Sequence, residues 1–210
     1  MMPNPDLDRW NERFSSKDYL FGTAPNAFLA RQRHRLRPGQ TALAIADGEG
    51  RNGVWLAEQG LDVLSIDFSP VALQKAHDLA VSRGVNLRTH QVDLEDWAWE
   101  PERFDVVAAI FIQFARPDLR AAIFQGIKRT LTPGGLLLLQ GYRPEQLRYG
   151  TGGPPHAENM YTAAMLRTAF AGFEILHLEE HDSVISEGRG HHGMSALVDL
   201  VARKPRLRSD

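Results

Sequence analysis

The sequence predicts an α/β fold in which helices cover both faces of a mostly parallel sheet. Three observations support this prediction. Short apolar runs alternate with helix-like segments along the chain. The runs are continuous rather than alternating, as expected for parallel strands that are covered on both faces. Gly and Pro separate the segments at intervals that suit strand and helix repeats rather than a long linker.

Seven strands are predicted. Apolar side chains predict five parallel strands at residues 41–46, 63–66, 87–92, 104–110 and 136–140. Two more runs, at residues 173–179 and 196–202, have no helical segment between them. Parallel strands need a crossover of about a dozen residues or more, so this last pair, joined by the polar stretch around residues 181–194, is expected to be antiparallel. The outline is a Rossmann-like three-layer sandwich with a seven-stranded, mostly parallel sheet that ends in an antiparallel pair.

The helices between these strands have recognisable ends. Ser69 and Pro70 supply an N-cap and a proline at the first helical position. Pro117 opens another helix, in which apolar residues recur every four positions up to Leu131. The helix after the first strand is expected to end near Gly60, and a short helix follows Thr162.

Length and charge limit the classes of function. A chain of 210 residues that is 43% hydrophobic can bury one substantial core, so residues 1–210 are predicted to form a single domain. A net charge of -2 offers no general attraction to nucleic acid or to an anionic membrane. The chain has no cysteine, which excludes thiolate ligands, and no metal site is predicted. With neither a signal-peptide pattern nor a bilayer-spanning run, the protein is expected to be cytoplasmic.

A glycine-rich turn follows the first strand. Gly48, Gly50 and Gly53 satisfy the spacing GxGxxG between a predicted strand and a predicted helix. Asp67 closes the second strand, where an acidic side chain can accept hydrogen bonds from ribose hydroxyls. This context predicts a nucleotide-containing cofactor at the carboxyl edge of the sheet, with Gly48 and Gly50 permitting close backbone approach.

Charge distinguishes between two cofactor classes. Asp47 and Glu49 lie in the turn, where they would repel the diphosphate of a dinucleotide. The sulfonium and ammonium groups of S-adenosylmethionine are complementary to the same acids. Asp93 follows the third strand, where it can accept a hydrogen bond from the adenine amino group while Leu94 packs on the ring. The sequence therefore favours S-adenosylmethionine.

At this point the chain resembles the class I methyltransferases, and within them the small branch similar to tellurite-resistance and thiopurine methyltransferases. The resemblance extends from about Trp10 to Lys204. The residues that carry it are Trp10, 19–22, 25–29, 48–53, Gly60, Asp67, Asp93, 131–135 and 187–193. It implies an N-terminal lid or helical segment at residues 1–38 and a Rossmann-like core at 39–204.

The resemblance and the turn together define the predicted cofactor site. It comprises Ala46, Asp47, Gly48, Glu49, Gly50, Asn52, Asp67, Phe68, Ser69, Asp93, Leu94 and Ile110. One departure concerns the methionine end of the cofactor. Ala44 stands where the family usually has an acid, and Ala46 where it usually has its first glycine.

Methyl transfer depends mainly on holding the nucleophile and the methyl group in line, and a general base is needed only for a protonated nucleophile. The catalytic candidates are His191 and His192, which are expected in the loop before the last strand, and Tyr142 after the fifth strand. The predicted function is methyl transfer to a small-molecule acceptor by a monomer or homodimer, without nucleic-acid or membrane partners. Two alternatives stay open: an NAD(P)-dependent oxidoreductase and a catalytically silent S-adenosylmethionine-binding module.

Overall fold

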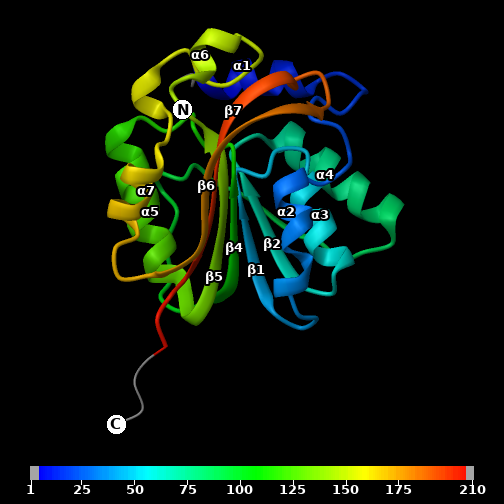
Figure 1. Ribbon diagram of the computed structural model, residues 1–210. Coiled ribbons are helices and arrows are strands. Elements are labelled where there is room, and N and C mark those ends of the chain that lie inside the picture. Colours follow the sequence, from blue (N-terminus) through cyan, green and yellow to red (C-terminus); the bar gives the residue numbers. More distant parts are fainter. Residues whose placement is uncertain (1–4, 207–210) are drawn as a thin grey trace.

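The computed structural model describes residues 5–206 and contains a seven-stranded sheet between two layers of helices (Figure 1). Residues 1–4 and 207–210 of the predicted domain lie outside the described residues. The strands are β1 (Thr41–Ile45), β2 (Asp62–Asp67), β3 (Arg88–Gln91), β4 (Phe104–Ile110), β5 (Leu131–Tyr142), β6 (Glu174–Glu187) and β7 (His191–Arg203). The helices are α1 (Pro5–Phe14), α2 (Ala27–Arg31), α3 (Arg51–Glu58), α4 (Pro70–Arg83), α5 (Pro117–Thr130), α6 (Gln146–Tyr149) and α7 (Ala163–Ala169), with 3-10 turns at Gln32–Arg35 and Ala157–Asn159.

The strand order is β3-β2-β1-β4-β5-β7-β6. Strands β1 to β5 pair in parallel, whereas β7 runs antiparallel to both β5 and β6. Helices α2, α3 and α4 cover one face, and α5 and α7 cover the other (Figure 1). The predicted fold class, including the antiparallel pair at the end of the sheet, is confirmed. Within residues 5–206, no helix has the length and apolar character needed to cross a membrane.

Successive side chains of the central strands pack on opposite faces of the sheet. Leu43 packs in the cluster that contains Ile123 of α5, while its neighbour Ala42 packs in the cluster that contains Val54 of α3. A strand between two helical layers has apolar neighbours on both sides, which explains the continuous apolar runs.

The helix ends follow the predicted capping. The Ser69 hydroxyl accepts a hydrogen bond from the Ala72 amide, Pro70 occupies the first turn, and Gly84 ends α4 in the left-handed conformation at φ 67°. Thr162 caps α7 by accepting from the Met165 amide. These helices begin where the sequence predicts.

Two strand predictions need correction. The polar stretch at residues 181–194 is not a long loop, because β6 continues to Glu187 and β7 begins at His191. Main-chain pairing sustains this hairpin even though its outer half is polar. The four residues of β3 are all exposed because β3 is an edge strand, so the expectation of a strand covered on both faces fails there.

Candidate functional site

The glycine-rich turn lies at the carboxyl edge of the sheet, between β1 and α3. Asp67, at the end of β2, bridges this turn to the next one: its Oδ2 accepts from the Gly48 amide and its Oδ1 from the Ser69 amide, both at 2.9 Å. Burial raises the pKa of Asp67, and the amide hydrogen bonds oppose that shift. Gly48 therefore lies directly beside the acid predicted to bind ribose.

The three glycines have different neighbours. A Cβ on Gly50 would lie 2.5 Å from the Cβ of Ala76, so Gly50 allows α3 and α4 to approach closely. A Cβ on Gly53 would lie 2.4 Å from Asp47 Oδ2. At Gly48 the nearest atom is in the Phe14 ring, 3.5 Å away. Of the two positions predicted to permit cofactor approach, Gly50 is thus occupied by helix packing, and only Gly48 faces the N-terminal segment.

Asp47 is turned into the protein. Its Oδ2 accepts from the Gly53 amide at 3.0 Å and from the Ser65 hydroxyl at 2.9 Å. Ser65 is the register partner of Ala44, so Asp47 brings a carboxylate beside the position where the predicted family acid is missing. Burial raises the pKa of Asp47 to about 7.

Glu49 is also engaged by protein groups. Its carboxylate forms an ion pair with Lys75 and accepts from the Leu20 amide at 2.7 Å. Lys75 in turn donates to the carbonyl oxygens of Phe14, Ser16 and Asp18. Glu49 therefore anchors the N-terminal segment. Asp47 and Glu49, which were expected to face a cationic cofactor, thus both have protein partners in this conformation.

The remaining predicted cofactor residues lie along the same edge. Asp93 is partly exposed and accepts from the Glu95 amide at 3.1 Å. Leu94 and Ile110 are already packed in the two core clusters, and Asn52 Oδ1 accepts from the Asn26 amide. Phe68 is partly buried, and the Ser69 hydroxyl donates to Asn11 of α1 at 2.6 Å. Ala46 has φ 46°, in the left-handed region where glycine is favoured.

An aromatic cluster lies next to the turn. The ring centroid of His191 is 4.4 Å from Phe21, 4.3 Å from Phe111 and 5.8 Å from Tyr142. Phe111 follows β4 and has φ 56°, a conformation that costs a non-glycine residue energy and is enriched at functional sites. The cluster joins the N-terminal segment to the ends of three strands.

Two of the three catalytic candidates meet in this cluster. Burial, followed by the charges of Arg51 and Arg13, lowers the pKa of His191 to about 3, and burial raises the pKa of Tyr142. Both histidines belong to β7, not to a loop, and successive side chains of a strand point to opposite faces. His192 is accordingly exposed and does not join His191.

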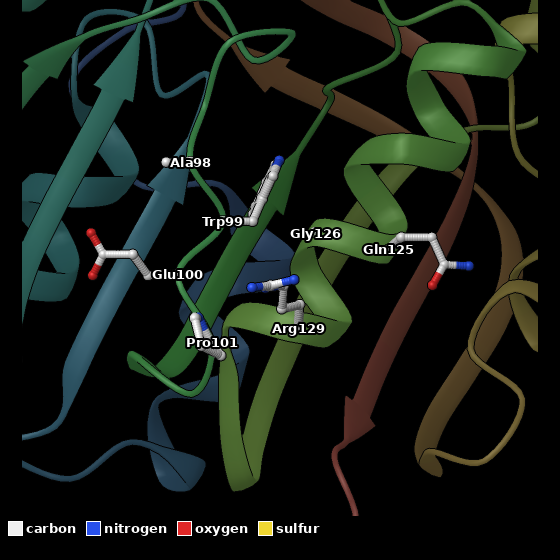
Figure 2. Close-up of a pocket in the computed structure, with 7 residues that line it drawn as sticks. All are labelled: Ala98, Trp99, Glu100, Pro101, Gln125, Gly126 and Arg129. Carbon is white, nitrogen blue, oxygen red and sulfur yellow. The ribbon is translucent and has the colours of Figure 1, made fainter.

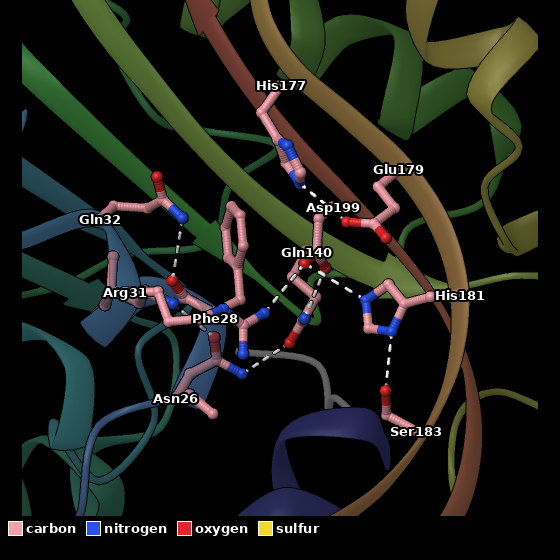
Figure 3. Close-up of polar contacts among 12 residues, drawn as sticks. Asn26, Phe28, Arg31, Gln32, Gln140, His177, Glu179, His181, Ser183 and Asp199 are labelled. Atoms are coloured by element: carbon pink, nitrogen blue, oxygen red, sulfur yellow. Dashed lines mark hydrogen bonds and ion pairs between the residues drawn. The ribbon is translucent and has the colours of Figure 1, made fainter.

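A buried polar network, not anticipated from the sequence, holds the N-terminal segment over the site. Glu187 forms an ion pair with Arg51 at 2.7 Å and accepts from Asn26 Nδ2 and the Ala27 amide, both at 3.0 Å. Figure 3 shows the continuation of the network from Asn26 to Gln140 and Asp199, at 2.7 and 2.6 Å. Asp199 also contacts Arg31 and His181. The sequence signals for this network were the family-like segments at residues 25–29, 48–53 and 187–193, which do not reveal that they meet.

The described residues also form two hollows at the surface. One is formed by Trp99, which packs on Gly126 of α5, with Pro101 and Arg129 (Figure 2). The other lies between residues 14–19 and α4. Neither contains Asp67, Tyr142 or His191, but the second adjoins the candidate site, because its lining residues Phe14 and Lys75 contact the turn at Gly48 and Glu49.

Comparison with known proteins shows similarity to methyltransferases over part of the chain. Residues 42–135 match the family model of a methyltransferase domain. An uncharacterized methyltransferase of Synechocystis sp. is 32% identical over 106 residues, which cover 50% of this chain and 48% of that protein. The chain spans about half or less of the length of the curated relatives it matches.

Two solved structures illustrate the shared fold. The N-methyltransferase NodS from Bradyrhizobium japonicum, in complex with S-adenosyl-L-homocysteine, has a TM-score of 0.74 at 14% identity, covering 97% of this chain and 100% of that one. TehB from Haemophilus influenzae has a TM-score of 0.71 at 17% identity, covering 94% and 66%. Residues 42–135 thus match a methyltransferase-domain model, and the chain shares its Rossmann-like fold with solved methyltransferase structures.

Proposed function

We propose that this protein is an S-adenosylmethionine-dependent methyltransferase that acts on a small-molecule acceptor. The main support is the position of Asp67, a buried acid that contacts the Gly48 amide at the carboxyl end of β2, within the segment that matches the methyltransferase domain. Ligands of open α/β sheets bind at this edge.

The residues present fit the cofactor. We assign the ribose to Asp67 and the adenine amino group to Asp93, with Ala46, Gly48, Phe68 and Ser69 lining the path between them. Phe14 lies over Gly48, so admission of the cofactor requires the N-terminal segment to move. We therefore propose that residues 1–38 include a lid.

When bound, the cofactor would supply an activated methyl group with a good leaving group. The residues of this chain would hold the acceptor in line with that methyl group. At neutral pH His191 is uncharged, because its pKa is about 3, and Tyr142 keeps its proton, because burial raises its pKa. Neither group is poised as a general base in this closed conformation. We propose that Tyr142 and His191 orient an acceptor that arrives with a free lone pair.

A calorimetric titration with S-adenosylhomocysteine, run beside one with NAD, tests this function. Micromolar binding of S-adenosylhomocysteine alone is expected. Binding of NAD alone would favour the oxidoreductase alternative. A dinucleotide stays open as a ligand because Lys75 neutralises Glu49, which weakens the repulsion expected between Glu49 and a diphosphate. Binding of S-adenosylhomocysteine without methyl transfer to a broad acceptor panel would favour a silent module.

The assignment to the branch similar to tellurite-resistance and thiopurine methyltransferases belongs to the same proposal. Its support is that the family-like segments at residues 19–22 and 25–29 both contact the family-like segment at residues 187–193. The Leu20 carbonyl accepts from the Gly190 amide at 3.1 Å, and Glu187 binds Asn26 and Ala27.

A further inference from the structure

Two buried side chains beside the aromatic cluster carry donors that lack a partner. Tyr142 is 1% exposed and Arg51 is 6% exposed, yet among residues 5–206 neither Tyr142 Oη nor Arg51 Nη1 has a hydrogen-bond partner. His191 Nδ1 is unpartnered in the same way within the described chain. Leaving a buried polar group unpaired is costly, so such atoms suggest a ligand.

These atoms surround one region. Phe111 lies between His191 and Tyr142, with ring centroids 4.3 and 4.7 Å away. Burial and the charge of Glu187 raise the pKa of Tyr142 and the charge of Arg51 opposes this, while burial and Arg51 lower the pKa of His191. Glu187, the ion-pair partner of Arg51, is the register partner of His191 in the β6–β7 hairpin. Arg51 is thus linked through Glu187 to the strand position of His191, whose ring contacts Phe111 and Tyr142.

The chemistry of the group selects an acid. A guanidinium can only donate, so its partner must accept a hydrogen bond. Glu187 occupies Nη2 of Arg51 and leaves Nη1 free, and the charge of Arg13 also acts on this region. A protonated amine would meet two cations with one carboxylate between them, whereas a carboxylate would complete the set.

The sheet order indicates which ligand carries the acid. Asp67 and Asp93, assigned to the adenosine, lie at the end of β2 and just after β3. Tyr142 and His191 belong to β5 and β7, beyond β4 on the other half of the sheet. The methyl group would lie between these halves. The unpartnered atoms of Tyr142 and His191 are therefore on the acceptor side, whereas Arg51 begins α3, next to the glycine-rich turn.

We propose that Tyr142 Oη and Arg51 Nη1 bind the carboxylate, or an equivalent acid group, of the methyl acceptor. The acceptor is a small organic acid whose apolar or aromatic body lies against Phe21 and Phe111. The loop at residues 150–153 packs on Tyr142, because a Cβ on Gly152 would lie 3.2 Å from Tyr142 Oη. In this proposal the loop borders the entry of the acceptor. This inference rests on the proposed function.

Tyr142→Phe and Tyr161→Phe form a matched pair for the test. Tyr161 Oη is also buried and unpartnered within residues 5–206, but its ring packs on Phe124 of α5 in a different apolar cluster from Tyr142. Each variant loses only a hydroxyl without a partner, so neither should lower the urea midpoint. The full-length protein, saturated with S-adenosylhomocysteine, is titrated with benzoate, phenylacetate and 3-phenylpropionate, with their primary amides, and with benzylamine.

We expect the acids to bind more tightly than the amides and benzylamine, and Tyr142→Phe alone to weaken acid binding about tenfold or more. The inference is wrong if no acid outbinds its amide, or if the two variants bind acids equally. Titrations with S-adenosylhomocysteine and 5′-methylthioadenosine identify the source of the carboxylate. If Tyr142→Phe weakens only the former, the donors hold the cofactor's own carboxylate and the acceptor assignment fails. Failure of the wild type to bind either nucleoside would instead defeat the proposed function, and this inference with it.

Discussion

Arg51 and Glu187, 136 residues apart in the chain, form a buried ion pair of 2.7 Å that ties the first turn of α3 to the end of β6. Their side chains are 6% and 9% exposed. Glu187 also holds Asn26 and Ala27, so this one carboxylate joins the glycine-rich turn, the hairpin and the N-terminal segment.

Glu187→Ala should lower the free energy of unfolding by about 3–5 kcal/mol, because it leaves the Arg51 charge buried without its partner. Urea unfolding measures the change. Glu174→Ala is the control, since its ion pair with Arg203 is 3.0 Å long but exposed and should contribute less than about 1 kcal/mol. Equal effects of the two substitutions would contradict the role of Glu187.

Asp67→Ala should weaken binding of S-adenosylhomocysteine about 10 to 100-fold, the loss expected for charge-assisted hydrogen bonds. It should also reduce stability, because the Gly48 and Ser69 amides lose their acceptor. Calorimetry on Asp67→Ala and on Asp62→Ala, an exposed acid of the same strand, separates the two effects. Unchanged affinity in Asp67→Ala would refute its assignment to the ribose.

Asp47 should make stability depend on pH. Its folded pKa of about 7 lies above the ordinary value of 3.8, so the folded state holds this proton more tightly than the unfolded state. The resulting stability is complete below pH 3.8 and is lost as the pH rises through 7. Relative to Asp47→Asn, the wild type should therefore lose stability between pH 5 and pH 8. Urea unfolding at both pH values measures this difference, in which contributions common to both proteins cancel. A parallel pH dependence of the two proteins would show that Asp47 does not titrate in this range.

Ala46→Gly should raise the free energy of unfolding by about 1 kcal/mol, because φ 46° is strained for alanine and open to glycine. Ala42→Gly in β1 is the control and should destabilise, since Ala42 is fully buried in a regular strand. Thermal and urea unfolding should both show Ala46→Gly to be stabilising and Ala42→Gly to be destabilising. A destabilised Ala46→Gly would show that the turn is not strained at this position.

Much of the fold was predictable because its signals are local. The cap at Ser69 and Pro70, the proline that opens α5 and the apolar run of β4 each act within a few residues. Asp67 was predictable as a site residue because the end of a parallel strand always lies at the carboxyl edge.

The direction of each turn side chain was not predictable. Asp47 and Glu49 are two residues apart, yet one bonds Ser65 on β2 and the other pairs with Lys75 on α4. Similarly, the sequence could not show which of His191 and His192 faces the cluster, because this depends on their alternating positions in β7.

The sequence by itself determined the order of strands and helices, the turn and the acid at the end of β2, because these follow from periodicity, caps and strand polarity. Only the tertiary structure decided that Glu187 meets Arg51 and that Tyr142 and His191 share a cluster with Phe21. Those contacts join segments far apart in the chain. Their geometry depends on the register of the β6–β7 hairpin and on its pairing with β5.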